Sequence, residues 1–487
     1  MLMLSILLPM LLGFGVLLKG EFKSRNTLLA ITGAGLAATA ALAMGVVLSG
    51  ETELALFSFG KNLDIYFHVD TMGKLFAVVV NAVWVLAGVY AFEYMKHEQE
   101  ETRFFGFYLV VHGTLNGLVF AGGMVTYYLF YELMSLLSVP LILHNRSKEA
   151  IKGGLKYLFY SLFGAYMVLF GIFFLNRFAD SLNFLPGGTL NLAAVAGNEK
   201  LMLVVAFSMI IGFSVKAGMF PLHAWLPTAH PVAPAPASAV MSGLIVKMGI
   251  LGMIRSVYYL VGADFIRGTW VQTVWLSLAL LTVFMGSMLA YREKIMKKRL
   301  AYSTVSQASY ILFGLALLQP QGMTGALLHV VFHAVIKSCL FLSAGAIIYK
   351  THKTRVEDLR GIGKEMPLTI WCYTFAAAAL IGIPPASGFI SKWYLATGAL
   401  ASGIEVFSWL GPVVLLTSAL LTAGYLLPIT VNGFLPGADF HYGELKKKEP
   451  CLTMLLPLLI LAALAVVLGI FPNPLTECIT ALANSVL

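Results

Sequence analysis

The chain has 487 residues, of which 59% are hydrophobic and 11% are charged, and its mean hydropathy is +0.85. Soluble domains carry about 25% charged residues, so this composition excludes an ordinary soluble protein. The net charge of +9 comes without a basic patch interleaved with aromatic residues, which argues against nucleic-acid binding.

Apolar runs of about 18 residues or more recur along the whole chain, which predicts an all-α polytopic membrane protein in a lipid bilayer. We expect about fourteen transmembrane helices, which run roughly over 1–18, 27–49, 71–95, 104–122, 124–143, 155–176, 201–219 with a broken extension to 230, 234–261, 271–291, 300–318, 322–349, 367–402 (interrupted), 405–434 and 453–472. The first run has neither a basic n-region nor a small-residue cleavage site, so we interpret it as a retained helix. The strand-like alternation of residues 51–69 predicts a hairpin.

The positions of Lys and Arg test this count independently, because these residues concentrate in cytoplasmic loops. Loops after odd-numbered spans hold 22 of the 32 basic residues, and loops after even-numbered spans hold four. The first group is Lys19, Lys23, Arg25, Lys96, Arg103, Arg146, Lys148, Lys152, Lys156, Arg292, Lys294, Lys297, Lys298, Arg299, Lys350, Lys353, Arg355, Arg360, Lys364, Lys446, Lys447 and Lys448; the second is Lys61, Arg177, Lys200 and Arg267. This alternation predicts that both termini lie on the outer side of the plasma membrane of a prokaryote.

No cofactor or metal ion is expected in this chain. The four cysteines, Cys339, Cys372, Cys451 and Cys478, form no CxxC spacing, which argues against an iron–sulfur cluster or structural zinc. No Rossmann glycine fingerprint and no P-loop occurs in the sequence. Redox chemistry or ATP hydrolysis, where it drives this protein, is therefore expected on another subunit.

Six basic residues fall within the spans themselves. Lys74 starts the third span and Arg255 lies near the outer end of the eighth, so we expect both to snorkel towards water. The charged residues well inside their spans are Glu132, Lys216, Lys247, Lys337 and Lys392. A charge at mid-bilayer costs roughly 2.5 kcal/mol or more. Buried ion pairs that tie helices together are the structural alternative, but one carboxylate cannot neutralise four lysines. The surplus favours lysines that gain and lose protons, as a proton relay requires.

The eleventh span adds a ladder of titratable groups in the stretch LLHVVFHAVIKSCLF. His329, His333 and Lys337 follow at i, i+4 and i+8, and therefore share one helix face over about 12 Å. Imidazole passes protons between its two ring nitrogens near neutral pH, so the spacing predicts a proton wire. His112 and Asn116, at i and i+4 in the fourth span, are a weaker candidate that fits a structural role equally well.

Prolines interrupt two spans. Residues 213–239, FSVKAGMFPLHAWLPTAHPVAPAPASA, hold five prolines, and residues 382–393, GIPPASGFISKW, hold two. A proline inside a helix frees a backbone carbonyl, and in lipid such irregular backbone survives only where it lines a cavity or is buried in protein. Each break carries one lysine, Lys216 or Lys392, and paired broken helices are typical of ion sites in transporters.

These stretches, together with SGLIVKMGILGMIR at 242–255 and HAVIKSCLFLSAG at 333–345, resemble the antiporter-like proton-translocating subunits of respiratory complex I. The same family includes subunits of Mrp-type cation/proton antiporters and of membrane-bound energy-converting [NiFe]-hydrogenases. The resemblance implies two inverted five-helix repeats, helices 4 to 8 and 9 to 13, with helices 7 and 12 broken. The corresponding expected parts are residues 1–103, 104–261, 271–434 and 435–487.

The resemblance also implies a role for each titratable residue. Glu132 matches the family's fifth-helix glutamate, which pairs with the seventh-helix lysine at Lys216, and Lys247 matches the eighth-helix lysine that links two half-channels. The eleventh-helix relay corresponds to His329, His333 and Lys337. Lys392 matches the terminal residue of the second half-channel; some members have glutamate there, and lysine argues against that branch.

Two assemblies remain open from the sequence. One is a complex-I-like or hydrogenase-like complex, in which redox chemistry on other subunits drives proton movement through this chain. The other is an Mrp-type Na⁺/H⁺ antiporter with no redox enzyme attached. Either interpretation implies other membrane subunits as partners and H⁺ as the transported ion, and the second adds Na⁺.

Overall fold

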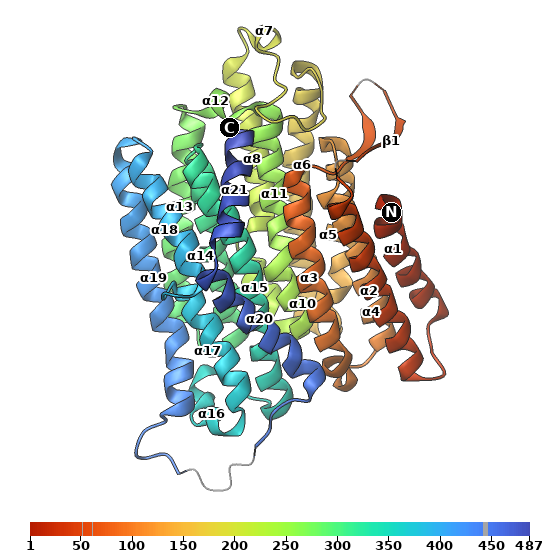
Figure 1. Ribbon diagram of the computed structural model, residues 1–487, viewed down its shortest axis with the longest axis vertical. Helices are drawn as coiled ribbons and strands as arrows, with labels where there is room; N and C mark the ends of the chain where they lie inside the picture. The colour runs from red at the N-terminus through yellow and green to blue at the C-terminus, as the bar shows by residue number, and fades with distance from the viewer. Residues whose placement is uncertain (51, 61, 442–446) are drawn as a thin grey trace.

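A computed structural model describes residues 1–50, 52–60, 62–441 and 447–487. Within these ranges, eleven helices are long and apolar enough to cross a membrane, and they stand side by side in one bundle (Figure 1). The expectation of a polytopic helical membrane protein is therefore confirmed. The basic residues Lys61 and Lys446 lie outside the described residues.

The first half of the chain forms helices α1 to α8 and one hairpin. Their bounds are α1 (Leu2–Lys19), α2 (Arg25–Leu48), β1 (Glu53–Ser58), β2 (Asp64–His68), α3 (Thr71–Tyr94), the 3₁₀ turn η1 (Met95–His97), α4 (Glu101–Val119), α5 (Met124–Ile142), α6 (Lys148–Phe178), α7 (Leu192–Val195) and α8 (Glu199–Ala217). The strands pair antiparallel, with Glu53 opposite His68 and Ser58 opposite Asp64, which confirms the predicted hairpin. Asp70 ends the hairpin and caps α3, because its carboxylate accepts the Gly73 N–H.

The second half is built from helices α9 to α21. Their bounds are α9 (Leu226–Val232), α10 (Ala235–Val240), the π segment η2 (Met241–Ile245), α11 (Val246–Ser256), the π segment η3 (Val257–Val261), α12 (Ala263–Ile266), α13 (Trp270–Arg292), α14 (Met296–Ala316), α15 (Pro320–Thr351), the 3₁₀ turn η4 (Val356–Leu359), α16 (Ile362–Glu365), α17 (Pro367–Ile381), α18 (Ser387–Ala401), α19 (Glu405–Phe434), α20 (Leu452–Ile470) and α21 (Asn473–Val486). Helix α21 was not among the expected elements.

The predicted breaks coincide with real interruptions of helical structure. Helix α8 ends at the left-handed glycine Gly218 (φ 78°), and the chain resumes as α9 at Leu226. Helix α17 ends at the left-handed glycine Gly382 (φ 94°), and α18 begins at Ser387. Both helices thus end on a glycine in the conformation that terminates helices most easily.

The long helix α15 runs through the interior of the bundle. It packs against α14, α17, α18, α20, α10 and α3, and nearly all of its span is buried. Helices α4 and α14 are not among the eleven apolar helices, and the twelfth predicted span is split into α17 and α18. Helix α14 is mostly buried and its mean hydropathy is low, because its serines, threonine and glutamine face protein rather than lipid.

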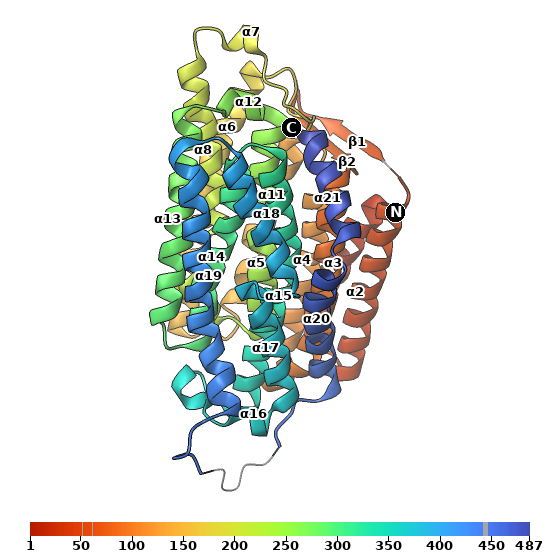
Figure 2. The ribbon, with the colours of Figure 1, turned by 60° about the vertical axis from the view of Figure 1, so that its left-hand side comes forward.

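Figures 1 and 2 place both chain ends toward the same end of the bundle, the end that also carries the hairpin, α7 and α12. Helix α16, in the basic stretch after α15, lies at the opposite end. This arrangement agrees with the separation of basic-rich and basic-poor loops expected from the sequence.

Candidate functional site

Lys216 is held by a group of hydroxyls. It lies on the last turn of α8, is 1% exposed, and donates hydrogen bonds to Ser135 Oγ (2.9 Å), Tyr157 Oη (2.9 Å) and Ser161 Oγ (2.8 Å). Its Nζ also lies 4.3 Å from the centre of the Tyr157 ring. Helix α5 supplies Ser135, and helix α6 supplies the other two hydroxyls. Three neutral acceptors and an aromatic face stabilise the ammonium without a direct counter-ion.

Glu132 lies near this group but does not touch it. Its carboxylate accepts a hydrogen bond from Tyr128 Oη (3.2 Å) and is half-buried, whereas all three side-chain hydrogen bonds of Lys216 go to hydroxyls. The two charges attract each other through space. The expected Glu132–Lys216 pair is therefore indirect in this structure, with the hydroxyls of α5 and α6 around the lysine.

The backbone around Lys216 is packed closely by glycines. A Cβ on Gly249 of α11 would lie 2.7 Å from the Phe213 carbonyl and 2.8 Å from Lys216 Cβ. On the α6 side, a Cβ on Gly164 would lie 2.5 Å from the Gly212 carbonyl. Helix α8 is thus in backbone contact with α6 and with α11.

Lys247 occupies the centre of the bundle, at the start of α11. Its Nζ donates to the Ser242 carbonyl (2.7 Å) in the π segment η2 and lies 2.5 Å from His333 Nδ1 on α15. The lysine is 1% exposed. A π segment within a membrane helix is frequent at functional sites, and here its carbonyl holds the ammonium. This contact joins the eighth-span lysine directly to the histidine ladder of the eleventh span.

The two ladder histidines stack and continue the row towards α18. The rings of His329 and His333 lie 5.7 Å apart at 26°, and His329 Nδ1 lies 2.8 Å from Ser391 Oγ. The other ring nitrogen of His329 lies 3.1 Å from Gln307 Oε1. Tyr310 stacks on His329 with centroids 5.5 Å apart.

Lys392 marks the far end of this row. Its Nζ donates to the carbonyls of Leu380 (2.6 Å) and Ile381 (2.9 Å), the last residues of α17, and lies 5.1 Å from the Tyr310 ring centre. The carbonyl end of a helix carries partial negative charge, and the break after α17 leaves these carbonyls free for a cation. The break and the lysine therefore act together, as the sequence suggested.

Lys337, the last member of the ladder, points elsewhere. It is fully buried and donates to the Leu300 carbonyl of α14 at 3.0 Å. Its Nζ lies 6.0 Å from the centre of the Phe341 ring. The structure thus aligns Lys247, His333 and His329 in one contact row, with Lys337 on a branch one turn along α15.

Sequence reasoning missed the polar residues that surround the charged ones. These are Ser135, Tyr157, Ser161, Gln307, Tyr310 and Ser391. Single serines and tyrosines are common in membrane helices, so their types alone carry no signal. Only the packing of α5, α6, α14 and α18 makes them neighbours of the lysines and histidines.

The expectation that Arg255 snorkels is wrong. Arg255 is 1% exposed and forms a two-pronged ion pair with Asp70 at the start of α3, with N–O distances of 2.5 and 2.7 Å. Its guanidinium also lies over the rings of Phe184 and Tyr259. The partner was not recognised because Asp70 lies 185 positions away in the chain, next to the hairpin.

Breaking this pair should destabilise the protein strongly. Removing one partner of a buried ion pair costs about 3–5 kcal/mol, since the other charge is left unpaired. We therefore expect Arg255→Leu to lower the melting temperature of the purified chain clearly, as measured by thermal unfolding in detergent. Arg355→Leu is the matched control, because the Arg355–Glu357 pair is half exposed and such pairs contribute about 0–1 kcal/mol. Equal melting temperatures for both variants would contradict the structural role of Arg255.

His112 belongs to a separate polar network between α1, α3 and α4. Its Nε2 lies 2.9 Å from Asn81 Oδ1, and Asn81 Nδ2 donates to Asn116 Oδ1 at 2.9 Å. Asn116 in turn donates to the Ser5 carbonyl at 3.1 Å. These bonds tie three helices together, and they favour the structural interpretation of His112 and Asn116.

Comparison with known families gives this arrangement a context. A family model described as NADH:quinone oxidoreductase/Mrp antiporter, TM, matches residues 121–422, which is more than half of the chain. The chain belongs to this NADH:quinone oxidoreductase/Mrp antiporter family. A second model, described as NADH-ubiquinone oxidoreductase (complex I), chain 5 N-terminus, matches residues 57–105. The resemblance noted in the sequence is thereby confirmed, and this multi-pass chain is an antiporter-like membrane subunit.

Individual relatives in the NADH:quinone oxidoreductase/Mrp antiporter family match over most of their length. The chain is 32% identical over 455 residues to an NADH-quinone oxidoreductase subunit N from Desulforudis audaxviator, and the match covers 89% of each chain. It is 28% identical over 495 residues to a Na(+)/H(+) antiporter protein from Alkalihalophilus pseudofirmus, covering 99% of this chain and 96% of the relative. A chain in the structure of an archaeal membrane-bound sulfane sulfur reductase superposes with a TM-score of 0.86 at 25% identity, over 100% of this chain and 97% of that one.

Proposed function

We propose that this chain is a proton-translocating subunit of a multi-subunit, energy-converting membrane complex related to complex I. The observation that carries the proposal is the buried row of titratable groups at the centre of the bundle. Lys247, His333 and His329 are in successive contact, and Tyr310 continues the row to Lys392. Each group except Tyr310 exchanges protons readily, and all are shielded from water by surrounding helices.

Lys216 forms a second station of the proposed path. Its hydroxyl partners offer both donors and acceptors, so they can hold the amine in its charged and its neutral form. Glu132 supplies the nearby carboxylate that favours the charged form when it is ionised. Protons would pass from Lys216 to Lys247 across the close contact of α8 and α11, through bound water.

The proposed architecture has fourteen spans: the eleven apolar helices, α4, α14, and the broken pair α17 and α18. Two inverted five-helix repeats would occupy residues 104–261 and 271–434, flanked by 1–103 and 435–487. The likeness of the two breaks supports this division, because each follows a left-handed glycine cap and each lies beside a titratable lysine.

The half-buried position of Glu132 supports a partner subunit beside α5. Leu129 and Leu136, on the same face of α5, are 44% and 48% exposed, so Glu132 lies on an apolar outer surface. A carboxylate that faces lipid is costly. We therefore propose that another membrane subunit of the complex covers this face.

The alternative function is that of an Mrp-type antiporter component, which the similarity to the Na(+)/H(+) antiporter protein favours. The two functions separate in vesicles that contain the purified complex. A Na⁺ pulse in the absence of an electron donor should leave the internal pH unchanged in a redox-driven pump, and should change it at once in an antiporter. Absence of proton movement under both a donor and a Na⁺ pulse would refute both functions.

A topology measurement tests the proposed orientation in the plasma membrane. A reporter fused after Leu487 should be active only on the outer side, and one inserted in the loop at 292–299 only in the cytoplasm. The physical reason is the concentration of basic residues in the loops at one end of the bundle. A cytoplasmic carboxyl terminus would show that the number of spans is odd.

A further inference from the structure

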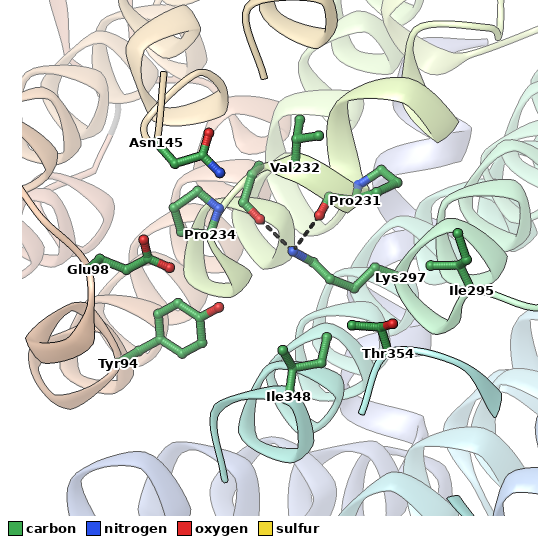
Figure 3. Close-up of a pocket in the computed structure, with 11 residues that line it drawn as sticks. Tyr94, Glu98, Asn145, Pro231, Val232, Pro234, Ile295, Lys297, Ile348 and Thr354 are labelled. Carbon is green, nitrogen blue, oxygen red and sulfur yellow. Dashed lines mark hydrogen bonds between the residues drawn. The ribbon is translucent and has the colours of Figure 1, made fainter. Parts of the chain in front are cut away.

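A polar cavity opens at the end of the bundle that carries the basic loops. Its volume is about 190 Å³, enough for several water molecules at roughly 30 Å³ each. Figure 3 shows the Lys297 side chain reaching into it, with Tyr94 and Glu98 across the cavity. The rest of the lining is Asn145, Pro231, Val232, Ala233, Pro234, Ile295, Ile348 and Thr354.

Lys297 forms the inner wall of this cavity. Its Nζ donates to the carbonyls of Ala233 (2.5 Å) and Pro231 (3.3 Å), which lie where α9 gives way to α10. Its side chain is 7% exposed. A lysine that only capped α9 would have been equally well served by a solvent-exposed position, whereas this ammonium is buried behind the water-sized space.

His230 follows directly inward from the cavity. It is fully buried, and neither ring nitrogen has a hydrogen-bond partner among the described residues. Its ring stacks on Phe341 with centroids 4.7 Å apart, and Lys337 Nζ lies 6.0 Å from the same Phe341 ring. His230 is also within electrostatic range of both Lys297 and Lys337. Unsatisfied buried imidazole nitrogens cost free energy unless water or a proton carrier completes their bonds.

We infer that this cavity is the port through which protons from the basic side reach the relay, in the order Glu98, Lys297, His230 and Lys337. The inference rests on the proposed function, and it gives Lys337 a role that the central row leaves open. Lys337 lies one turn of α15 from His333, so a proton delivered there is close to the row through Lys247 and His329.

Charges around Lys297 adjust it to this task. Burial lowers the pKa of Lys297 to about 8, although the attraction of Glu98 opposes the shift. Burial raises the pKa of Glu98, opposed by Lys297 and His97. The other titratable groups that face this site are Tyr94 on α3, His230 on α9 and Lys337 on α15. Below pH 8 the port is loaded with a proton, and above pH 8 it is increasingly empty.

Variants of Lys297 test the port in inside-out vesicles that contain the whole complex, with its own energy source driving translocation. Lys297→Met keeps the length of the side chain and removes the proton carrier, and should reduce translocation at least fivefold. Lys297→His should retain activity at pH 6 and lose it about one pH unit or more below wild type, because imidazole titrates near 6.5. Lys298→Met is the matched control: Lys298 is one-third exposed, pairs with Glu293, and should leave translocation unchanged.

The outcomes separate the port from the relay. His230→Gln should lower translocation at least threefold without a change in the amount of assembled complex. Wild-type translocation and an unshifted pH profile in Lys297→Met, Lys297→His and His230→Gln, with translocation abolished in Lys247→Ala, would overturn the port alone. Normal translocation in Lys247→Ala would overturn the proposed function. Should Lys297→Met fail to assemble, the pH profile of Lys297→His decides the question.

Discussion

Lys216→Ala should reduce proton translocation at least tenfold while the complex still assembles. The variant removes a titratable amine and leaves Ser135, Tyr157 and Ser161 to bond with one another or with water, so the fold keeps satisfied partners. Glu132→Gln should have a similar effect, because the amide cannot follow the charge of the lysine. The measurement is the pH change inside reconstituted vesicles per unit of energy supplied.

The matched control for this result is Lys200→Ala. Lys200 lies in the first turn of the same helix, at the opposite end of α8 and exposed to water, and its loss should not affect translocation. Because the structure contains an indirect Glu132–Lys216 arrangement, Tyr157→Phe offers a finer test. It deletes one acceptor of Lys216 and should slow translocation less than Lys216→Ala does. Translocation at the wild-type rate in Lys216→Ala would remove this lysine from the path.

Lys247→Ala should abolish transfer between the two halves of the bundle, because it deletes the only amine in contact with His333 Nδ1 among the described residues. Lys247→His should keep part of the activity, since imidazole also titrates. Two charges about 10 Å apart at an effective dielectric near 20 interact by about 1.7 kcal/mol, which changes proton affinity more than tenfold. That coupling is enough to direct a proton from one station to the next without trapping it.

The ladder histidines should respond in a graded way. His329→Ala or His333→Ala alone should reduce translocation less than the double variant, because water can fill the space of one ring. Mutating His112, which lies outside the row and ties α3 to α4, should affect stability rather than translocation. A double variant that translocates normally, with the wild-type pH dependence, would mean that the path avoids the ladder.

Membrane class, hairpin, breaks and titratable residues followed from the sequence, because each rests on local composition or spacing. The i, i+4 spacing of His329 and His333 sufficed to predict their stacking. The partners of these residues did not follow, since contacts such as Arg255–Asp70 and Lys216–Ser135 join positions 185 and 81 residues apart. The π segment that holds Lys247 was equally hidden, because residues 241–245 read as ordinary apolar helix.

The glycine contacts on both sides of α8 bear on how such a machine moves. Gly164 and Gly212 bring α6 against α8, and Gly249 brings α11 against it, so the backbone beside Lys216 has no free space in which to slide. Transporters that alternate access by rocking one bundle against another need a deformable seam, and this contact offers none. The working strokes must then be rotations of single side chains and rearrangements of water, which take picoseconds to nanoseconds. Energized and resting forms of this subunit should therefore superpose almost perfectly along α6, α8 and α11, and the turnover rate should be set by the partner that supplies the energy.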